Sequence, residues 1–378
     1  MKKPKKNYWE ERSRMSNTPK LRFPEFTGEW EEKRLGECLT LLYGKDWKDK
    51  SSTKKLYPVL GTGGVISYID EFIYDKPCVL IGRKGSINNP VFIDKPFWTV
   101  DTQFYSEIHE GYSPKFLYYI FCTENWSKHD ESTGVPSLSA KNVENTYKHI
   151  PSYSEQQKIA DFLSNVDSII TAETKILKTL QKKKKALMQK LFTQQLRFKS
   201  ADGTDFPAWE EKKVIDFAKV DTGANNTQDK VEDGPYPFYV RSPIIYRSNN
   251  YIFDFPEAVL TVGDGVGTGK VFHYVQGKFD CHQRVYVIHD FENVLGKYFY
   301  FYFSEKFYAR VKPMSAKNSV DSVRREMITD MKIPIPCKAE QQKIADCLSS
   351  LDSLIQTQQK VVTAWQQRKK ALLQQMFV

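Results

Sequence analysis

A seven-residue segment that occurs twice decides the fold of this 378-residue chain. Glu155-Gln-Gln-Lys-Ile-Ala-Asp161 recurs unchanged as Glu340-Gln-Gln-Lys-Ile-Ala-Asp346, and the match extends over 12 of the 16 positions from 155 to 170. In the same register, Lys185-Ala-Leu-Met-Gln-Lys-Leu-Phe192 matches Lys370-Ala-Leu-Leu-Gln-Gln-Met-Phe377. Similarity of this length at a fixed offset indicates internal duplication. The chain therefore contains two copies of one unit, each a globular domain followed by a long helix.

Shorter matches extend the duplication upstream of the helices. Trp30-Glu-Glu-Lys33 corresponds to Trp209-Glu-Glu-Lys212, and Tyr57-Pro58 corresponds to Tyr236-Pro237. The segments we expect are an N-terminal extension at 1–14, a first globular domain at 15–153, a long helix at 154–194, a second globular domain at 195–337 and a second long helix at 338–378. The extension is unexpected, because Met15 resembles a more typical start.

Both long helices carry a heptad pattern of apolar residues, which is typical of a coiled coil. In the first helix the pattern is Ile159, Phe162, Val166, Ile169, Ile176, Leu180 and Leu187, with Glu173 and Lys183 in two apolar positions and Leu163, Ile170 and Leu177 widening the stripe. In the second it is Ile344, Cys347, Leu351, Leu354, Val361, Trp365 and Leu372, with Gln358 and Arg368 as the polar pair. We predict an antiparallel pair, each helix about 57 Å long. The alternative is two amphipathic helices that pack only on their own domains.

The globular domains look rich in β-strands, so the fold class is α+β with a pseudo-twofold duplication. In the first domain, strands are predicted at 57–60, 78–81, 91–93, 97–100 and 103–108. Ser113-Pro114 then begins a helix, as its N-cap and first residue. In the second domain, strands are predicted at 258–262, 271–275 and 285–288, and a helix from about Val294 to Phe303.

The charge distribution favours local rather than global attraction to a polyanion. The net charge is +10, but residues 41–150 carry 13 basic and 13 acidic residues, and residues 214–335 carry 15 of each. Because electrostatic affinity for DNA scales with the phosphates neutralised, we expect the isolated chain to bind DNA weakly. No stretch approaches the roughly 20 apolar residues of a membrane span, and the basic start lacks the apolar part of a secretory signal. The six cysteines lie far apart, which suits a cytoplasmic protein.

No motif in the chain indicates catalysis. Gly263-Asp-Gly-Val-Gly-Thr-Gly-Lys270 departs from the phosphate-binding loop at Asp264 and Val271, and a turn between two strands explains it better. The chain has no Asn-Pro-Pro-Tyr or Asn-Pro-Pro-Phe motif of adenine methylation and no cluster with metal-ligand spacing. Asp264 and Asp280 would suit a nuclease, but their counterparts in the repeat are not both acidic. We predict a non-catalytic protein that binds no metal or cofactor.

The order of these parts resembles that of type I restriction-modification specificity subunits over essentially residues 15–378. Leu21-Arg-Phe-Pro-Glu-Phe26 and Trp30 precede a β-rich domain, Ile150-Pro151, the repeated heptapeptide and a heptad helix, and the whole series then recurs. The resemblance implies two target-recognition domains that each read half of a bipartite, asymmetric double-stranded DNA target, with the helix pair setting the gap. It also implies two adenine-methyltransferase subunits and two motor-nuclease subunits as partners. S-adenosylmethionine, ATP and Mg are then expected on those subunits, not on this chain.

The candidate DNA-binding residues are mainly arginines, side-chain amides and other polar residues in predicted loops. In the major groove, Arg forms paired hydrogen bonds with guanine, and Asn or Gln forms them with adenine. Gln103 and Gln283 fall at equivalent places in the repeat, and Ser137 and Ser322 are predicted to cap short helices whose N-termini suit phosphate. The candidates are Thr62, Arg83, Lys84, Ser86, Asn88, Gln103, Ser137 and Lys141 in the first domain, and Arg241, Ser242, Thr268, Lys270, His282, Gln283, Arg284, Ser322, Arg324 and Arg325 in the second.

The starts of the two helices are the candidate surface for the methyltransferase subunits. The residues are Gln156, Lys158, Asp161, Gln341, Lys343 and Asp346, for which simple helix capping is the structural alternative. The competing function is a DNA-binding coiled-coil scaffold or regulator outside restriction. That alternative predicts tight DNA binding by the chain alone.

Overall fold

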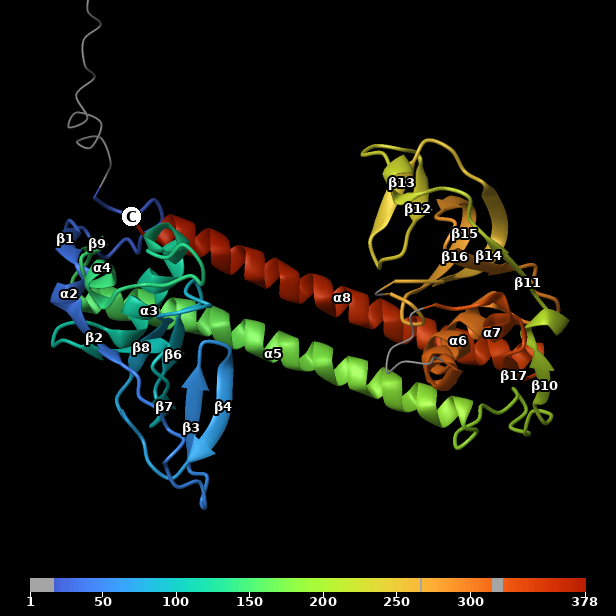
Figure 1. Ribbon diagram of the computed structural model, residues 1–378, viewed down its shortest axis with the longest axis horizontal. Helices are drawn as coiled ribbons and strands as arrows, with labels where there is room; N and C mark the ends of the chain where they lie inside the picture. Colours follow the sequence, from blue (N-terminus) through green and yellow to red (C-terminus); the bar gives the residue numbers. More distant parts are fainter. Residues whose placement is uncertain (1–16, 266, 315–321) are drawn as a thin grey trace, which may run out of the picture. The chain divides into compact units, whose positions relative to one another are not determined.

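The computed structural model describes residues 17–265, 267–314 and 322–378, so the predicted extension at 1–14 lies outside the described residues. The chain divides into a first unit, residues 1–174 and 360–378, and a second unit, residues 175–359. Two long helices, α5 (Tyr153–Phe192) and α8 (Lys338–Met376), each contribute a segment to both units (Figure 1). The two long helices predicted at 154–194 and 338–378 are confirmed, and their ends differ from the predicted ones by at most two residues.

The described residues of the first globular domain form three sheets. A four-stranded sheet has the order β2 (Leu39–Tyr43), β8 (Gln103–Ile108), β5 (Cys78–Gly82) and β6 (Val91–Ile93). A three-stranded sheet has the order β4 (Gly64–Ile69), β3 (Tyr57–Gly61) and β7 (Trp98–Thr99), and β1 (Glu31–Arg34) pairs with β9 (Tyr147–Ile150). The helices are α2 (Leu35–Cys38), α3 (Pro114–Thr123) and α4 (Ala140–Glu144), with a 3-10 turn at Trp126–His129.

Local sequence explains why these elements form where they do. All five residues of β5 are buried, as expected for an apolar run covered on both faces. Ser113 Oγ accepts a hydrogen bond from Phe116 N, which confirms this residue as the N-cap of α3. The helix then buries Phe116, Leu117 and Ile120 against the domain core, and a buried side chain of this size contributes about 1.5–3 kcal/mol.

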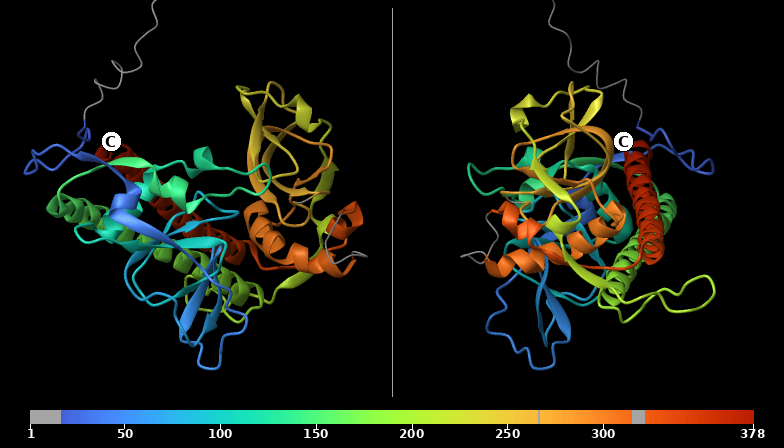
Figure 2. Two further views of the ribbon diagram at one scale, coloured as in Figure 1. Left: turned by 60° about the vertical axis from the view of Figure 1, so that its left-hand side comes forward. Right: turned by 90° about the vertical axis from the view of Figure 1, so that its right-hand side faces the viewer.

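The second unit repeats this plan with one larger sheet. The strand order is β11 (Lys219–Thr222), β16 (Val285–His289), β14 (Phe253–Val262), β15 (Phe272–Cys281), β12 (Tyr236–Tyr239) and β13 (Ile245–Ser248). α6 (Gly296–Val311) packs against β14 and β15 (Figure 2). β10 (Glu210–Lys213) pairs with β17 (Lys332–Ile335), α7 spans Arg325–Thr329, and 3-10 turns lie at Val214–Asp216, Thr227–Asp229 and Lys312–Met314. The predicted strands of both domains are confirmed, although β7 is shorter and β14 and β15 are longer than expected.

The two long helices are antiparallel, as the contacts inside each unit show. In the first unit Asp167 pairs with Lys369 at 2.6 Å, and Leu163 shares a core with Met376. In the second unit Lys184 pairs with Asp352 at 2.5 Å. Asp167 and Asp352 are equivalent in the repeat, as are Lys184 and Lys369. The pairing is therefore pseudo-twofold, and two equivalent ion pairs set its register.

The predicted contact face of the helices requires a correction. Phe162, Ile169 and Ile176 are 37%, 36% and 46% exposed, whereas Leu163 and Leu177 are buried. In α8 Leu354 is 54% exposed, and Val362 is buried in place of its neighbour Val361. Alternate positions of the predicted stripe are thus shifted by one residue, because apolar pairs such as Phe162-Leu163 satisfy either register of the heptad. The predicted positions between them, such as Ile159, Val166 and Ile344, are buried as predicted. The same shift replaces Lys183 with Lys184 on the paired face.

The C-terminal end of each helix packs into a globular core. In the first unit the end of α8 reaches the core of the N-terminal domain, where Met376 is buried and the Phe377 ring lies 5.5 Å from Phe116 and 6.4 Å from Trp30. In the second unit the end of α5 contributes Leu191 and Phe192 to the core of the other domain. Each globular core is therefore completed by the helix C-terminus contributed by the other copy of the repeat.

Candidate nucleic-acid interface

The repeated heptapeptide builds a buried clamp at the start of each long helix. Glu155, whose side chain is 2% exposed, accepts two hydrogen bonds from Arg22, at 2.7 and 2.8 Å, and one from Trp30 Nε1 at 3.2 Å. In the second unit Glu340 accepts the equivalent bonds from Arg197 and Trp209. Burying a carboxylate is costly unless a positive group compensates its charge, and the guanidinium of Arg does so with two parallel hydrogen bonds. Sequence reasoning missed this role, although the recurrence of Arg and Trp ahead of each domain was a visible signal.

The predicted partner-binding residues divide into buried and exposed members. Gln156 bonds to Ser113 N and Pro151 O, and Gln341 bonds to Leu295 N and Pro336 O, so both amides are buried and satisfied within the chain. Lys158 pairs with Glu25 at 3.5 Å, and Lys343 donates to Lys199 O at 2.6 Å. These lysines, together with Asp161 and Asp346, stay on the surface.

Three loops of the first unit meet beyond the end of β5. Arg83 N and Lys84 N both donate to Thr102 O, and Leu138 N donates to Arg83 O. Lys84 also forms an isolated bridge with Ser137. The chain turns sharply here, because a Cβ on Gly82 would lie 2.5 Å from Ser86 O. Predicted residues from distant parts of the sequence are thus brought to one loop cluster.

Arg83 is held in position within this first loop cluster. Its guanidinium donates to Asp101 O at 2.9 Å and lies over the Tyr43 ring, 5.4 Å from the centroid. Tyr43 is itself 54% exposed. An arginine that is fixed by a carbonyl and an aromatic face, yet has free donors, is suited to forked recognition of a base or phosphate.

The remaining candidate residues of the first unit differ in their exposure to solvent. Lys84, Ser86, Asn88 and Lys141 are exposed, and Thr62 and Ser137 are half-buried. Asn88 Oδ1 accepts from Trp126 N at 2.8 Å. Gln103 is 2% exposed and its Oε1 accepts from Thr99 Oγ1, so its amide is directed into the domain.

The second unit brings together an equivalent loop cluster. Gly263 N donates to Arg284 O, Val323 N donates to Gly263 O, and Asp264 forms a bridge with Ser322. Gly85 and Gly265 occupy matching positions and have φ values of +84° and +83°. The two clusters therefore share one backbone design.

The chemistry of the second cluster differs from that of the first. Asp264 lies 3.3 Å from Arg241 Nη1 and 3.7 Å from Arg284 Nε, so one carboxylate holds two arginines. Its neighbour His282 is buried, and burial, followed by the charge of Arg241, lowers the pKa of His282. The ring is thus neutral near pH 7, and Nδ1 accepts a hydrogen bond from Arg284 N.

The other candidates of the second unit surround this cluster. Lys270 lies over the Tyr308 ring, Gln283 Nε2 donates to Asn226 Oδ1 at 2.7 Å, and Thr268 is buried. Arg324 is exposed, Arg325 Nη2 lies 3.9 Å from Asp221, and Ser242 is half-buried.

Two details of the sequence analysis are wrong. Gly44 N donates to Gln103 O, and its counterpart Gly223 N donates to Val285 O. Gln103 therefore corresponds to Val285, not to Gln283. The N-cap of α4 is Ser139 rather than Ser137, and α7 begins after Arg324 rather than Ser322. Both helices have only five residues, so neither offers an extended N-terminus to a phosphate.

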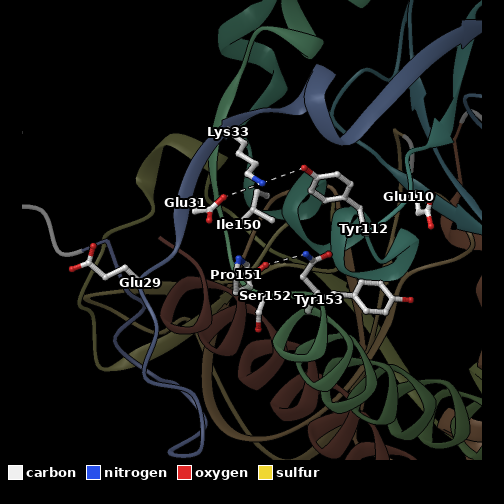
Figure 3. Close-up of a pocket in the computed structure, with 11 residues that line it drawn as sticks. Glu29, Glu31, Lys33, Glu110, Tyr112, Ile150, Pro151, Ser152 and Tyr153 are labelled. Carbon is white, nitrogen blue, oxygen red and sulfur yellow. Dashed lines mark hydrogen bonds and ion pairs between the residues drawn. The ribbon is translucent and has the colours of Figure 1, made fainter.

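A polar pocket of about 350 Å³ opens near the start of α5, away from these loop clusters in the sequence. Its lining includes Glu29, Glu31 and Glu110, and Lys33 lies 3.0 Å from Glu31 and 3.4 Å from the Tyr112 hydroxyl (Figure 3). Three carboxylates against one ammonium disfavour an anionic ligand. The pocket is therefore not part of a nucleic-acid interface.

Asp264 and Asp280, the two aspartates that would suit a nuclease, are both held by neighbouring side chains. Asp264 holds two arginines, and buried Asp280 accepts hydrogen bonds from Asn225 and Ser248 through Oδ2. Within 17–265, 267–314 and 322–378, no three His, Cys, Asp or Glu side chains gather as metal ligands. Over the same residues, none of the helices combines the length and apolarity needed to cross a bilayer.

Comparison with known proteins places both copies of the repeat in one family. Residues 27–182 and 208–364 match the type I restriction modification DNA specificity domain. The MjaVIII specificity subunit of Methanocaldococcus jannaschii is 25% identical over 93% of this chain and 92% of its own length. The EcoDI specificity subunit of Escherichia coli is 29% identical over 38% of this chain and 31% of its own.

A solved structure has the same fold. The crystal structure of a type I restriction-modification S subunit from M. genitalium superposes with a TM-score of 0.69 at 15% identity, covering 96% of this chain and 99% of that one. The interpretation as a regulator outside restriction is set aside by these matches. The chain belongs to the type I restriction-modification DNA specificity family, and its function is the non-catalytic recognition of DNA sequence.

Proposed function

We propose that each globular domain reads one half of a bipartite, asymmetric DNA target and that the helix pair fixes the gap between the halves. The observation that carries this proposal is the pair of loop clusters, which share one backbone design but differ in side chains. The first presents Arg83 on Tyr43, whereas the second presents Arg241 and Arg284 around Asp264. Similar frames with different side chains suit two different half-sites.

Within this proposal exposed and half-buried side chains read DNA, and the fully buried ones support them. Arg83, Lys84 and Ser86 in the first domain, and Arg241, Gln283 and Arg284 in the second, are the strongest candidates for base contacts. Thr62, Asn88, Lys141, Lys270, Ser242, Ser322, Arg324 and Arg325 are proposed at the edges of the two interfaces. Gln103, Thr268 and His282 are proposed to position the loops, because each is buried.

The chain is further proposed to dock two adenine-methyltransferase subunits, and through them two motor-nuclease subunits. The surface of the long helices supports a protein partner, since Ile169, Ile176 and Leu354 are 36%, 46% and 54% exposed. Exposed apolar residues at heptad spacing are typical of helix–helix contacts. Lys158 and Asp161 in the first unit, and Lys343 and Asp346 in the second, would then add polar contacts at the start of each helix.

The test uses the complex of this chain with methyltransferase subunits of its own system. Methylation of a randomised duplex library should yield one two-part consensus, while the chain alone binds DNA weakly. Arg83→Ala should relax or abolish reading of the first half only, and Arg284→Ala should act on the second half only. A single contiguous consensus, or an Arg83→Ala complex with unchanged half-site preference, would contradict the proposal.

A further inference from the structure

Two loops of equal length at equivalent places in the repeat have opposite charge. Residues 45–56 follow β2 and precede β3, and residues 224–235 follow β11 and precede β12. The first loop carries five lysines and two aspartates, a net charge of +3. The second carries one lysine, two aspartates and one glutamate, a net charge of −2. The duplication therefore provides an internal comparison in which the loop length and the position between flanking strands are the same.

The backbone of the lysine-rich loop is fixed by Asp70, at the end of β4. Asp70 accepts hydrogen bonds from the amides of Thr53, Lys54 and Lys55 at 2.8 to 3.1 Å, and from the Ser51 hydroxyl at 2.7 Å. Lys55 has a φ of +52°, a conformation that this ring of bonds maintains. The loop thus presents its lysines from an ordered backbone, which lowers the entropy that binding must remove.

Most of these lysines are available to a ligand. Lys45, Lys48, Lys54 and Lys55 are exposed, and none of the ion pairs found among the described residues involves them. Lys50 differs, because it pairs with Glu71 at 3.1 Å and lies over the Trp98 ring. Four ammonium groups on one twelve-residue loop thus stay outside the ion pairs of the described residues, although Lys48 also interacts electrostatically with Asp46.

The position of the loop, next to the first loop cluster, favours DNA phosphates as its ligand. Its first residue, Lys45, follows Tyr43 by two positions, and Tyr43 carries the Arg83 guanidinium of the first loop cluster. Lys45 N also donates to Thr99 O, which ties the loop to β7. A set of flexible ammonium groups beside a forked arginine suits a row of phosphates next to a base-reading site.

The counterpart loop lacks these properties. Lys230 lies over the Tyr246 ring, Asp229 accepts from Asn226 N, and Glu232 and Asp233 are exposed. An exposed acidic segment repels a phosphate backbone.

We propose that loop 45–56 binds the phosphate backbone beside the first half-site, and that loop 224–235 makes no such contact. Loop 45–56 then adds an electrostatic contribution to DNA binding that its counterpart in the second domain does not make. This inference rests on the proposed half-site function and assigns a further binding surface to it. Because phosphate contacts carry no sequence information, the loop adds affinity without changing which bases are read.

The experiment measures DNA affinity of the methyltransferase complex against salt concentration. The test variant is Lys48→Ala, Lys54→Ala and Lys55→Ala combined. The matched control removes the same charge from the same domain through Lys76→Ala, Lys95→Ala and Lys128→Ala, three other exposed lysines. Each phosphate contact contributes about 0.9 to the slope of log K against log salt, so the test variant should lower the slope by up to roughly 2.7.

The outcomes separate the inference from the proposed function. A lowered slope in the test variant alone, with an unchanged affinity ratio between target and scrambled duplex, is the expected result. Equal slopes in test variant and unmodified complex, or equal losses in test and control, would overturn the inference. A changed target-to-scrambled ratio would instead indicate base reading and also overturn it. Absence of any two-part preference in the unmodified complex would reject the proposed function itself.

Discussion

The end of α8 should stabilise the N-terminal domain, although it follows the C-terminal domain in sequence. Met376 is 2% exposed and belongs to the core that contains Trp30, Phe116 and Leu163. Met376→Ala removes most of a buried side chain, and such changes cost about 2–5 kcal/mol. Each change of about 1.4 kcal/mol in the free energy of unfolding changes the equilibrium constant tenfold. A decrease of about 3 kcal/mol therefore lowers amide protection of the affected unit by roughly two orders of magnitude.

Hydrogen exchange followed by mass spectrometry locates this loss. Faster exchange is expected in β1, β9 and α3 of the first unit, while β14 to β16 of the second unit stay protected. The matched variant is Leu191→Ala, the equivalent position of α5, which is 1% exposed in the core of the second unit. It should produce the reverse pattern. Faster exchange in the second unit on Met376→Ala, with the first unit unchanged, would refute the cross-packing described here.

Further predictions concern the clamps, the lysine loop and the helix pair. Arg22→Ala should lower the free energy of unfolding of the first unit by about 3–5 kcal/mol, because it leaves the buried Glu155 carboxylate without its ionic partner. Adding Glu155→Gln to the same chain should recover part of that loss. Unchanged urea unfolding of Arg22→Ala would count against the clamp. The hydrogen bond from the Ser51 hydroxyl, with those from three backbone amides, lowers the pKa of Asp70. Stability from this group is therefore present above the unfolded pKa and is lost as the pH falls through the folded value. Amide signals of Lys54 and Lys55 should show that acid transition, and Asp70→Asn should abolish it; an identical transition in the variant would disprove the role of Asp70. Seven residues inserted after both Thr174 and Gln359 lengthen each helix by about 10.5 Å, which should widen the target gap by about three base pairs. An unaltered gap in the methylated consensus would exclude the helix pair as its determinant.

Sequence alone determined the duplication, the long helices and most of the strands. Repetition of Glu-Gln-Gln-Lys-Ile-Ala-Asp needs no structural information, and a continuous apolar run such as Cys78–Gly82 predicts a strand that is buried on both faces. The candidate arginines were also accessible, because forked donors in glycine-containing turns are a local signal.

Tertiary structure decided everything that depends on which segments meet. Adjacent apolar residues such as Phe162 and Leu163 satisfy two helical registers, and only packing against α8 selects Leu163. Insertions and deletions shift the offset between the copies along the chain, so pairing through Gly44 and Gly223 was needed to match Gln103 with Val285. The burial of Glu155 beside Trp30, and the packing of Phe377 on Trp30, join residues more than a hundred positions apart. Local patterns record the propensity and amphipathicity of a segment, but partner choice between distant segments is set by the free energy of the whole packed core, which no local pattern contains.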